Sequence, residues 1–101
     1  MNRVIKLSKR TTKKLNELLE YLENEWSEKV KIDFIDKLER KLNLIKSNPE
    51  SFQKSDLVKG LHQCVITIQT TIYYRYDNDF IYIITLFDNR QNPNKLAREV
   101  E

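Results

Sequence analysis

Cationic and aromatic side chains in the C-terminal half of this sequence are its residues best suited to chemistry. The set comprises Lys59, His62, Tyr73, Tyr74, Arg75 and Arg90. Such groups could cleave RNA without a metal, by orienting a 2′-hydroxyl and stabilising the pentavalent phosphate through guanidinium contacts. His62 is the only histidine, and histidine titrates near neutrality. A lone histidine beside a strand is more often half-exposed than catalytic, so both interpretations of His62 stay open.

Arg75 and Arg90 each have a functional and a structural interpretation. Arg75 lies among tyrosines, where its guanidinium can stack on a ring and still bind phosphate or carboxylate. Alternatively, Arg75 pairs with one of the nearby aspartates for stability alone. Arg90 lies in the short polar segment 88–93, and loops of this kind often carry function, which favours the functional interpretation over a solvated arginine.

Several classes of protein are excluded by what the sequence lacks. Its single glycine cannot build a glycine-rich phosphate loop, and no serine lies in a hydrolase motif. One histidine and one cysteine, Cys64, give no histidine metal pair, cysteine zinc site or internal disulfide. We therefore expect no cofactor, no metal and a buried Cys64. Without an apolar run of about 20 residues or a signal-type stretch, we expect a cytoplasmic protein that does not bind membranes.

The length of 101 residues, with 40% hydrophobic and 33% charged residues, predicts one globular domain, 1–101. The net charge of +3 is uneven, because residues 1–16 contain six basic residues and no acidic one. This segment could bind nucleic acid or an acidic partner, or form a solvated helix face. Lys9, Arg10 and Lys13 are its candidates for binding a target or partner.

The first half of the chain predicts a strand followed by two helices. Residues 3–7 read as a strand that stops at Ser8, a helix cap. A first helix follows from Lys9, and a second follows Ser27 and ends at Asn48-Pro49. Their apolar stripes are Leu15, Leu18, Leu19, Leu22 and Trp26, then Val30, Phe34, Leu38, Leu42 and Ile45. So short a break between helices predicts an antiparallel helical hairpin.

The second half predicts a loop over residues 49–60 and three strands, over 64–69, 72–76 and 80–87, with a turn at 77–79. Together with the N-terminal strand, these elements predict an α+β fold of two layers. In this fold the helical hairpin packs on a mainly antiparallel sheet of about four strands.

The last predicted strand is apolar on both faces, so both need a cover. Its alternation places Phe80, Tyr82, Ile84 and Leu86 on one face and Ile81, Ile83 and Phe87 on the other. The hairpin covers only one face, which would leave Tyr73, Ile81, Ile83 and Phe87 exposed. Either the tail, 88–101, or a partner covers these four residues. We expect a partner, because the tail offers only Pro93, Leu96, Ala97 and Val100 as apolar material.

Four segments follow one another along nearly the whole chain: LSKRTTKKLNELLEYLENEW, IKSNPESF, KGLHQCVI and IYYRYDNDFIYIITLFDNRQNPNKL. In this order, the sequence resembles the RelE/ParE toxin superfamily. This resemblance implies the toxin half of a type II toxin–antitoxin module, neutralised by a small antitoxin in a hetero-oligomeric complex. Family antitoxins wrap an extended or helical segment around the toxin, which would supply the missing cover. DNA contact would come only through the antitoxin.

The family implies two mechanisms. RelE-like members cut messenger RNA on the ribosome with basic residues and a C-terminal Tyr or His, whereas ParE-like members poison DNA gyrase. This chain has no Tyr or His after Tyr82, which favours a ParE-like, non-catalytic toxin that arrests growth and stabilises plasmids. In the ribonuclease alternative, Arg75 and Arg90 match arginines of the nucleases, with His62 and Lys59 as further candidates. A non-toxic binding module with the same fold is a third hypothesis.

Overall fold

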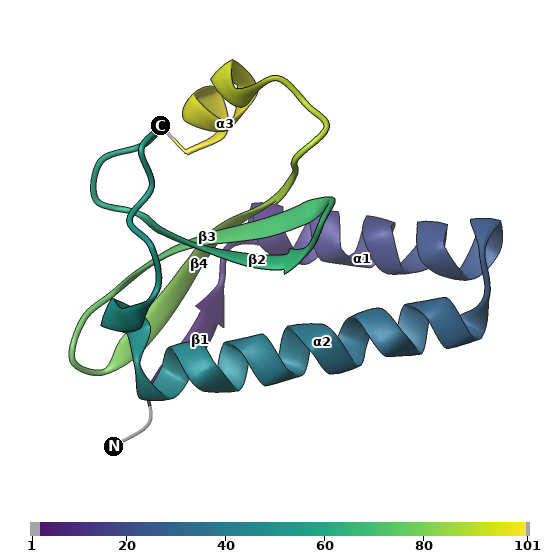
Figure 1. The fold of residues 1–101 in the computed structure, drawn as a ribbon, viewed down its shortest axis with the longest axis horizontal. Coiled ribbons are helices and arrows are strands. Elements are labelled where there is room, and N and C mark those ends of the chain that lie inside the picture. Colours follow the sequence, from purple (N-terminus) through teal and green to yellow (C-terminus); the bar gives the residue numbers. More distant parts are fainter. Residues whose placement is uncertain (1–2, 101) are drawn as a thin grey trace.

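The computed structural model describes residues 3–100 and has the predicted α+β architecture (Figure 1). The sheet has the strand order β1-β4-β3-β2, with β1 parallel to β4 and the other neighbours antiparallel. In chain order the elements are β1 (Val4–Leu7), α1 (Lys9–Glu25), α2 (Glu28–Ser47), the 3-10 turn η1 (Pro49–Ser51), β2 (His62–Thr67), β3 (Thr70–Tyr76), β4 (Phe80–Asp88) and α3 (Pro93–Glu99).

The helical hairpin begins and ends at the predicted residues. The Ser8 hydroxyl accepts the backbone N–H of Thr11 at 3.0 Å, and the Ser27 hydroxyl accepts that of Val30 at 3.1 Å. Each serine therefore caps the free donors of a helix N-terminus. At the end of α2, Asn48 and Pro49 stop the helix as predicted. The two antiparallel helices pack on one face of the sheet and extend beyond it (Figure 1).

The main core lies between this hairpin and the sheet. Cys64 is buried there, as predicted. Tyr74 lies at its centre, fully buried, and its hydroxyl donates a 2.6 Å hydrogen bond to the carbonyl of Pro49. The buried members are Phe34, Leu38, Ile45, Cys64, Ile66, Ile72, Tyr74, Ile81, Ile83 and Leu86. The presence of Ile81 and Ile83 in this core contradicts their predicted position on the second face.

A bulge in β4 explains the difference. Tyr73 pairs with Thr85 but Tyr74 pairs with Ile83, which leaves Ile84 without a partner across the ladder. An extra residue shifts the phase of side-chain alternation along the strand. Ile83 therefore faces the helices before the bulge, and Leu86 faces them after it. The prediction assumed one uninterrupted alternation and placed Ile81 and Ile83 on the wrong face.

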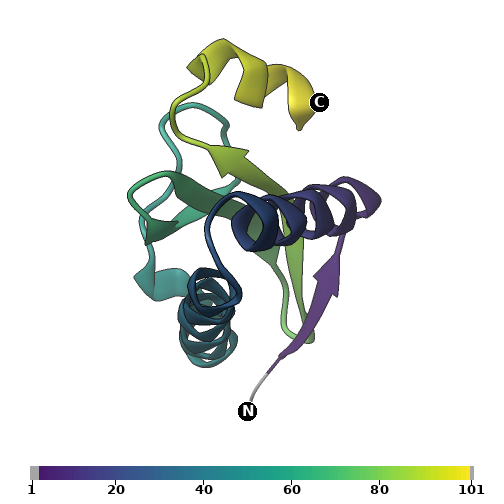
Figure 2. The same ribbon diagram turned by 90° about the vertical axis from the view of Figure 1, so that its right-hand side faces the viewer.

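The chain's own α3 covers the second face around Tyr73 and Phe87. Leu96 of α3 is fully buried, and Leu61, Tyr73 and Phe87 are buried with it in a second cluster. Helices α3 and α2 lie on opposite sides of the sheet (Figure 2). The expectation that a partner rather than the tail covers this face is therefore wrong, because α3 of the tail packs Leu96 against it, with Val58 and Val100 beside the cluster.

Trp26 and Val30 of the predicted helix stripes are exposed, and so is Ile68 of the strand predicted over 64–69. Trp26, at the C-cap of α1, is 68% exposed because the helix ends at Glu25 and leaves its ring off the apolar stripe. Ile68 is 94% exposed because β2 ends at Thr67 and Ile68 lies in the turn to β3. Among residues 3–100, no helix has the length and apolar character needed to cross a membrane.

Candidate functional site

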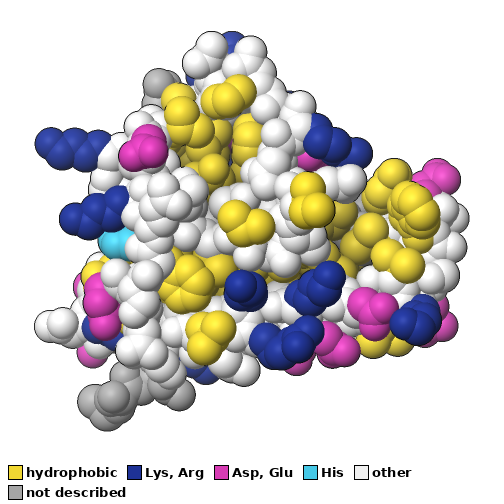
Figure 3. Space-filling model, in the orientation of Figure 1, with side chains coloured by type: hydrophobic (Ala, Val, Ile, Leu, Met, Phe, Trp, Pro, Cys, Tyr) yellow, Lys and Arg dark blue, Asp and Glu magenta, His cyan; other side chains and the backbone are white. Residues whose placement is uncertain are grey.

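A groove of about 1020 Å³ lies between the far end of the helical hairpin and the β2–β3 turn. The helical hairpin extends beyond the sheet, so side chains at its far end have no strand to pack against. These side chains form the floor and walls of the groove. Figure 3 shows hydrophobic side chains gathered at this end of the molecule. The apolar members are Leu18, Tyr21, Leu22, Trp26, Val30, Phe34, Ile68 and Leu86. Exposed aromatic and aliphatic side chains around a hollow are typical of a protein-binding surface.

Charged side chains of both signs surround this groove. The basic members are Lys14, Lys37, Arg90 and Lys95, and the acidic members are Glu17, Asp33 and Asp88. Arg90 is held at the rim by Asp88, with 2.7 Å between the nearest guanidinium nitrogen and carboxylate oxygen. The hydrogen bonds from Arg90, which outweigh partial burial, lower the pKa of Asp88. An apolar floor with a mixed polar rim fits an amphipathic segment of another protein.

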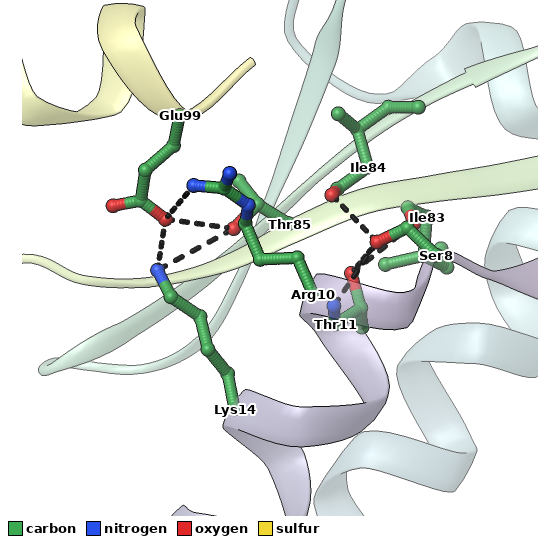
Figure 4. A network of polar contacts seen from close by, with 8 residues as sticks. All are labelled: Ser8, Arg10, Thr11, Lys14, Ile83, Ile84, Thr85 and Glu99. Carbon is green, nitrogen blue, oxygen red and sulfur yellow. Dashed lines mark hydrogen bonds and ion pairs between the residues drawn. The ribbon is translucent and has the colours of Figure 1, made fainter.

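A buried polar network ties α3 to the rest of the fold (Figure 4). The Glu99 carboxylate, with 7% of its side chain exposed, contacts the Lys14 ammonium and lies 3.6 Å from the Arg10 guanidinium. It also accepts a hydrogen bond of 3.3 Å from the Thr85 hydroxyl. Burial opposes ionisation of Glu99, but Lys14, Thr85 and Arg10 outweigh it and lower its pKa. This carboxylate gives Arg10 and Lys14 a counter-charge near the α1 N-terminus, where the helix dipole disfavours cations.

The same end of α1 supports the β4 bulge (Figure 4). Thr11 is buried and its hydroxyl donates to the Ile83 carbonyl at 3.1 Å, while the Ser8 hydroxyl donates to the Ile84 carbonyl at 2.9 Å. A bulge leaves carbonyls that the strand ladder does not satisfy. The first turn of α1 therefore fixes the place where side-chain alternation in β4 changes phase.

His62 and Arg75 lie together at a separate, shallow depression by the start of β2. Its lining consists of Glu50, Lys54, Gly60, His62, Arg75 and Tyr76. The His62 ring stacks on Tyr74 at 5.5 Å between centroids, and its Nδ1 is buried without a hydrogen-bond partner in the described chain. Burial and then the charge of Lys54 lower the pKa of His62, and together they outweigh the opposing charge of Glu50. Figure 3 shows this histidine beside basic side chains.

The residues predicted for RNA cleavage are not assembled in one place. Arg75 lies over the Tyr82 ring at 5.6 Å and, in the described chain, has no carboxylate partner. Arg90 belongs instead to the groove, and Lys59 is exposed in the loop before β2 without lining the depression. Within residues 3–100, no cluster of three or more His, Cys, Asp or Glu side chains is placed to hold a metal.

The other predicted binding residues divide into exposed and buried groups. Lys9 and Lys13 are exposed, and Arg10 is partly engaged by Glu99. Tyr73, Ile81, Ile83 and Phe87 are buried by the chain itself, so they form no open apolar face. Sequence reasoning missed Tyr21, Trp26 and Ile68 as surface residues and Glu99 as the partner of the N-terminal cations. For Trp26 the sequence did contain a signal of exposure. This residue lies directly before Ser27, the N-cap of α2, and therefore in the break between the two helices.

Comparison with known proteins shows the family. The sequence matches the family described as ParE toxin of type II toxin-antitoxin system, parDE, over residues 5–93. The chain therefore belongs to the ParE toxin family. Its structure is similar to one described as the chromosomal ParDE TA system from P. aeruginosa, with a TM-score of 0.67 and 13% identity. The similarity covers 85% of this chain and 95% of that chain and shows a shared fold. The search of curated proteins gave no match.

Proposed function

We propose that this ParE family member arrests growth by poisoning DNA gyrase in the cytoplasm and that a small cognate antitoxin neutralises it. The observation that carries the proposal is the family match over residues 5–93, which includes every groove-lining residue except Lys95. Poisoning requires only that the toxin bind gyrase and block religation. No residue of this chain then needs to perform catalysis.

The groove is the proposed antitoxin site. Trp26, at the end of α1, and Ile68, in the β2–β3 turn, both line it, and both are largely exposed. An amphipathic segment that covered them would remove large apolar surface from water, the main source of affinity at such sites. The exposed Lys9 and Lys13 remain candidates for contacting either the antitoxin or gyrase.

The arrangement of cationic residues supports a toxin that binds rather than cleaves. His62 and Arg75 share a depression, but Arg90 is held by Asp88 in the groove. A ribonuclease needs its base and its phosphate-binding groups around one scissile bond. We therefore place the gyrase mechanism first.

Two measurements test this proposal. Purified protein added to gyrase and supercoiled plasmid should trap cleaved DNA, and expression in cells should stop growth without shortening transcripts. If transcripts are cut at codon positions and Arg75→Ala abolishes the cuts, the toxin is a ribonuclease instead. Normal growth on expression without a partner would indicate a binding module that has no toxicity.

A further inference from the structure

The two edges of the sheet differ in how they are covered. Along β2, the Gln63 N–H donates to the Gln53 carbonyl at 2.8 Å, and Lys54 forms a bridge with His62. This edge is therefore partly closed by the chain preceding it. Along β1, no described residue pairs with the side away from β4, and Figure 2 shows that side facing outward. An open strand edge is a template for another strand.

The backbone groups at this open edge follow from the hydrogen bonds to β4. The Val4 N–H donates to the Asp79 carbonyl at 3.0 Å, and the Ser8 N–H donates to the Ile83 carbonyl at 3.1 Å. Successive residues of a strand direct their N–H and C=O groups to opposite edges. Ile5 and Leu7 therefore direct theirs away from β4, which gives two donors and two acceptors for an added strand.

The side chains around this edge select by charge. Val4 and Leu7 are 59% and 44% exposed, so apolar surface accompanies the free backbone groups. Lys6 lies in β1 itself, and the exposed Lys9 and Lys13 follow in the first turns of α1, with no acidic residue before Glu17. Lysines on an edge repel other basic strands and so oppose pairing between copies of the same edge. The same lysines attract an acidic strand.

We propose that β1 binds an extended, acidic segment of a partner protein as a fifth strand of the sheet. The main-chain bonds of Ile5 and Leu7 hold the segment, and Lys6, Lys9 and Lys13 give it its charge preference. This edge shares no residue with the groove. The inference therefore does not depend on the toxin activity proposed above, and a chain that failed the gyrase test would still be expected to pair.

Two synthetic peptides test the proposal on the full wild-type chain. One alternates Val with Glu, and its control alternates Val with Lys. Amide hydrogen exchange by NMR reports the Ile5 and Leu7 N–H groups directly. With free acidic peptide at about ten times its Kd, exchange at both amides should slow about tenfold. No binding, binding without protection of these amides, or equal protection by the lysine peptide would overturn the proposal.

Matched variants separate the backbone and charge contributions. Leu7→Pro removes an outward N–H without touching the bonds to β4, and Leu7→Ala removes only the side chain. We expect the proline variant to bind the acidic peptide several-fold more weakly than the alanine variant. Lys9→Glu should also weaken binding several-fold, while Lys59→Glu, the same charge change in a distant loop, should not. Equal effects in either pair would contradict the proposal.

Discussion

The ammonium of Lys14 on α1 contacts the buried carboxylate of Glu99 on α3, across 85 residues of sequence. Arg10 and Thr85 approach the same oxygen, so the network joins the first turns of α1, strand β4 and the C-terminal helix. Because α3 also buries Leu96 against Tyr73 and Phe87, the network fixes the helix that covers the second face. The stability of this cover is therefore linked to the N-terminal cations.

Glu99→Gln should lower the free energy of unfolding by about 2 kcal/mol, the typical value for a hydrogen bond to a charged group. The change keeps the shape of the side chain but leaves the partly buried Lys14 without its counter-charge. Urea denaturation measures the loss. Glu39→Gln, at an exposed position of α2, is the control and should change stability by no more than about 0.5 kcal/mol. Equal effects would show that the network contributes nothing.

Acid should destabilise the protein in a way that depends on Glu99. Its folded-state pKa lies below the ordinary value of 4.5, so its contribution is complete above pH 4.5 and is lost as the pH falls through the folded-state pKa. The lowered pKa of Asp88 adds a similar loss starting near pH 3.8. Unfolding free energies measured across this range should fall less steeply in Glu99→Gln. An unchanged slope would contradict the lowered pKa.

Leu96→Ala should lower the unfolding free energy by about 3 kcal/mol, because a fully buried leucine is replaced and a cavity remains. The same change should increase binding of a hydrophobic dye as Tyr73 and Phe87 become accessible. Leu57→Ala provides the control, since Leu57 is half exposed in the loop before β2. A loss in Leu96→Ala no larger than in the control would mean that α3 does not seal this face.

Local signals at element ends made most of the fold predictable. Ser8, Ser27 and Asn48-Pro49 act within a few residues of themselves, so the hairpin followed from sequence alone. The bulge at Ile84 could not be predicted from the sequence. Because β4 is apolar on both faces, its residue types do not change where the bulge reverses which side chains face the helices. The cover by α3 rests on one leucine and one buried glutamate, whose partners are distant in sequence.

The candidate site was less predictable for a related reason. Trp26 and Ile68 are apolar residues next to apolar stripes, and their exposure depends on where α1 and β2 end. One residue of difference in either boundary moves the side chain from the core to the groove. Both interpretations of Arg75 and Arg90 were open from the sequence, and the structure pairs Arg90 with Asp88 while Arg75 lies over the Tyr82 ring. Their placement at different sites depends on the length of β3 and β4, which spacing alone does not give.

Tyr74→Phe should destabilise the protein by about 1–2 kcal/mol, since the variant leaves the Pro49 carbonyl without its buried donor. Burial is the main cause that raises the pKa of Tyr74. Its hydroxyl therefore stays protonated throughout the physiological pH range and can donate its hydrogen bond to Pro49. Tyr76→Phe is the matched control, because no described residue hydrogen-bonds its hydroxyl. Thermal or urea unfolding measures the stability of both variants. Equal stabilities would show that the Tyr74 hydroxyl does not stabilise the fold through the Pro49 carbonyl.

Trp26→Ala and Ile68→Asp should weaken antitoxin binding while leaving the fold intact. Both side chains are mostly exposed in the isolated chain, so their loss removes little buried surface on folding. Aromatic residues at a protein interface typically contribute about 2 kcal/mol, which corresponds to roughly 30-fold in Kd. Calorimetry with the cognate antitoxin would measure this effect. Leu44→Ala, half exposed on α2 outside the groove, should bind normally. Unchanged affinity in both groove variants would place the antitoxin on another surface.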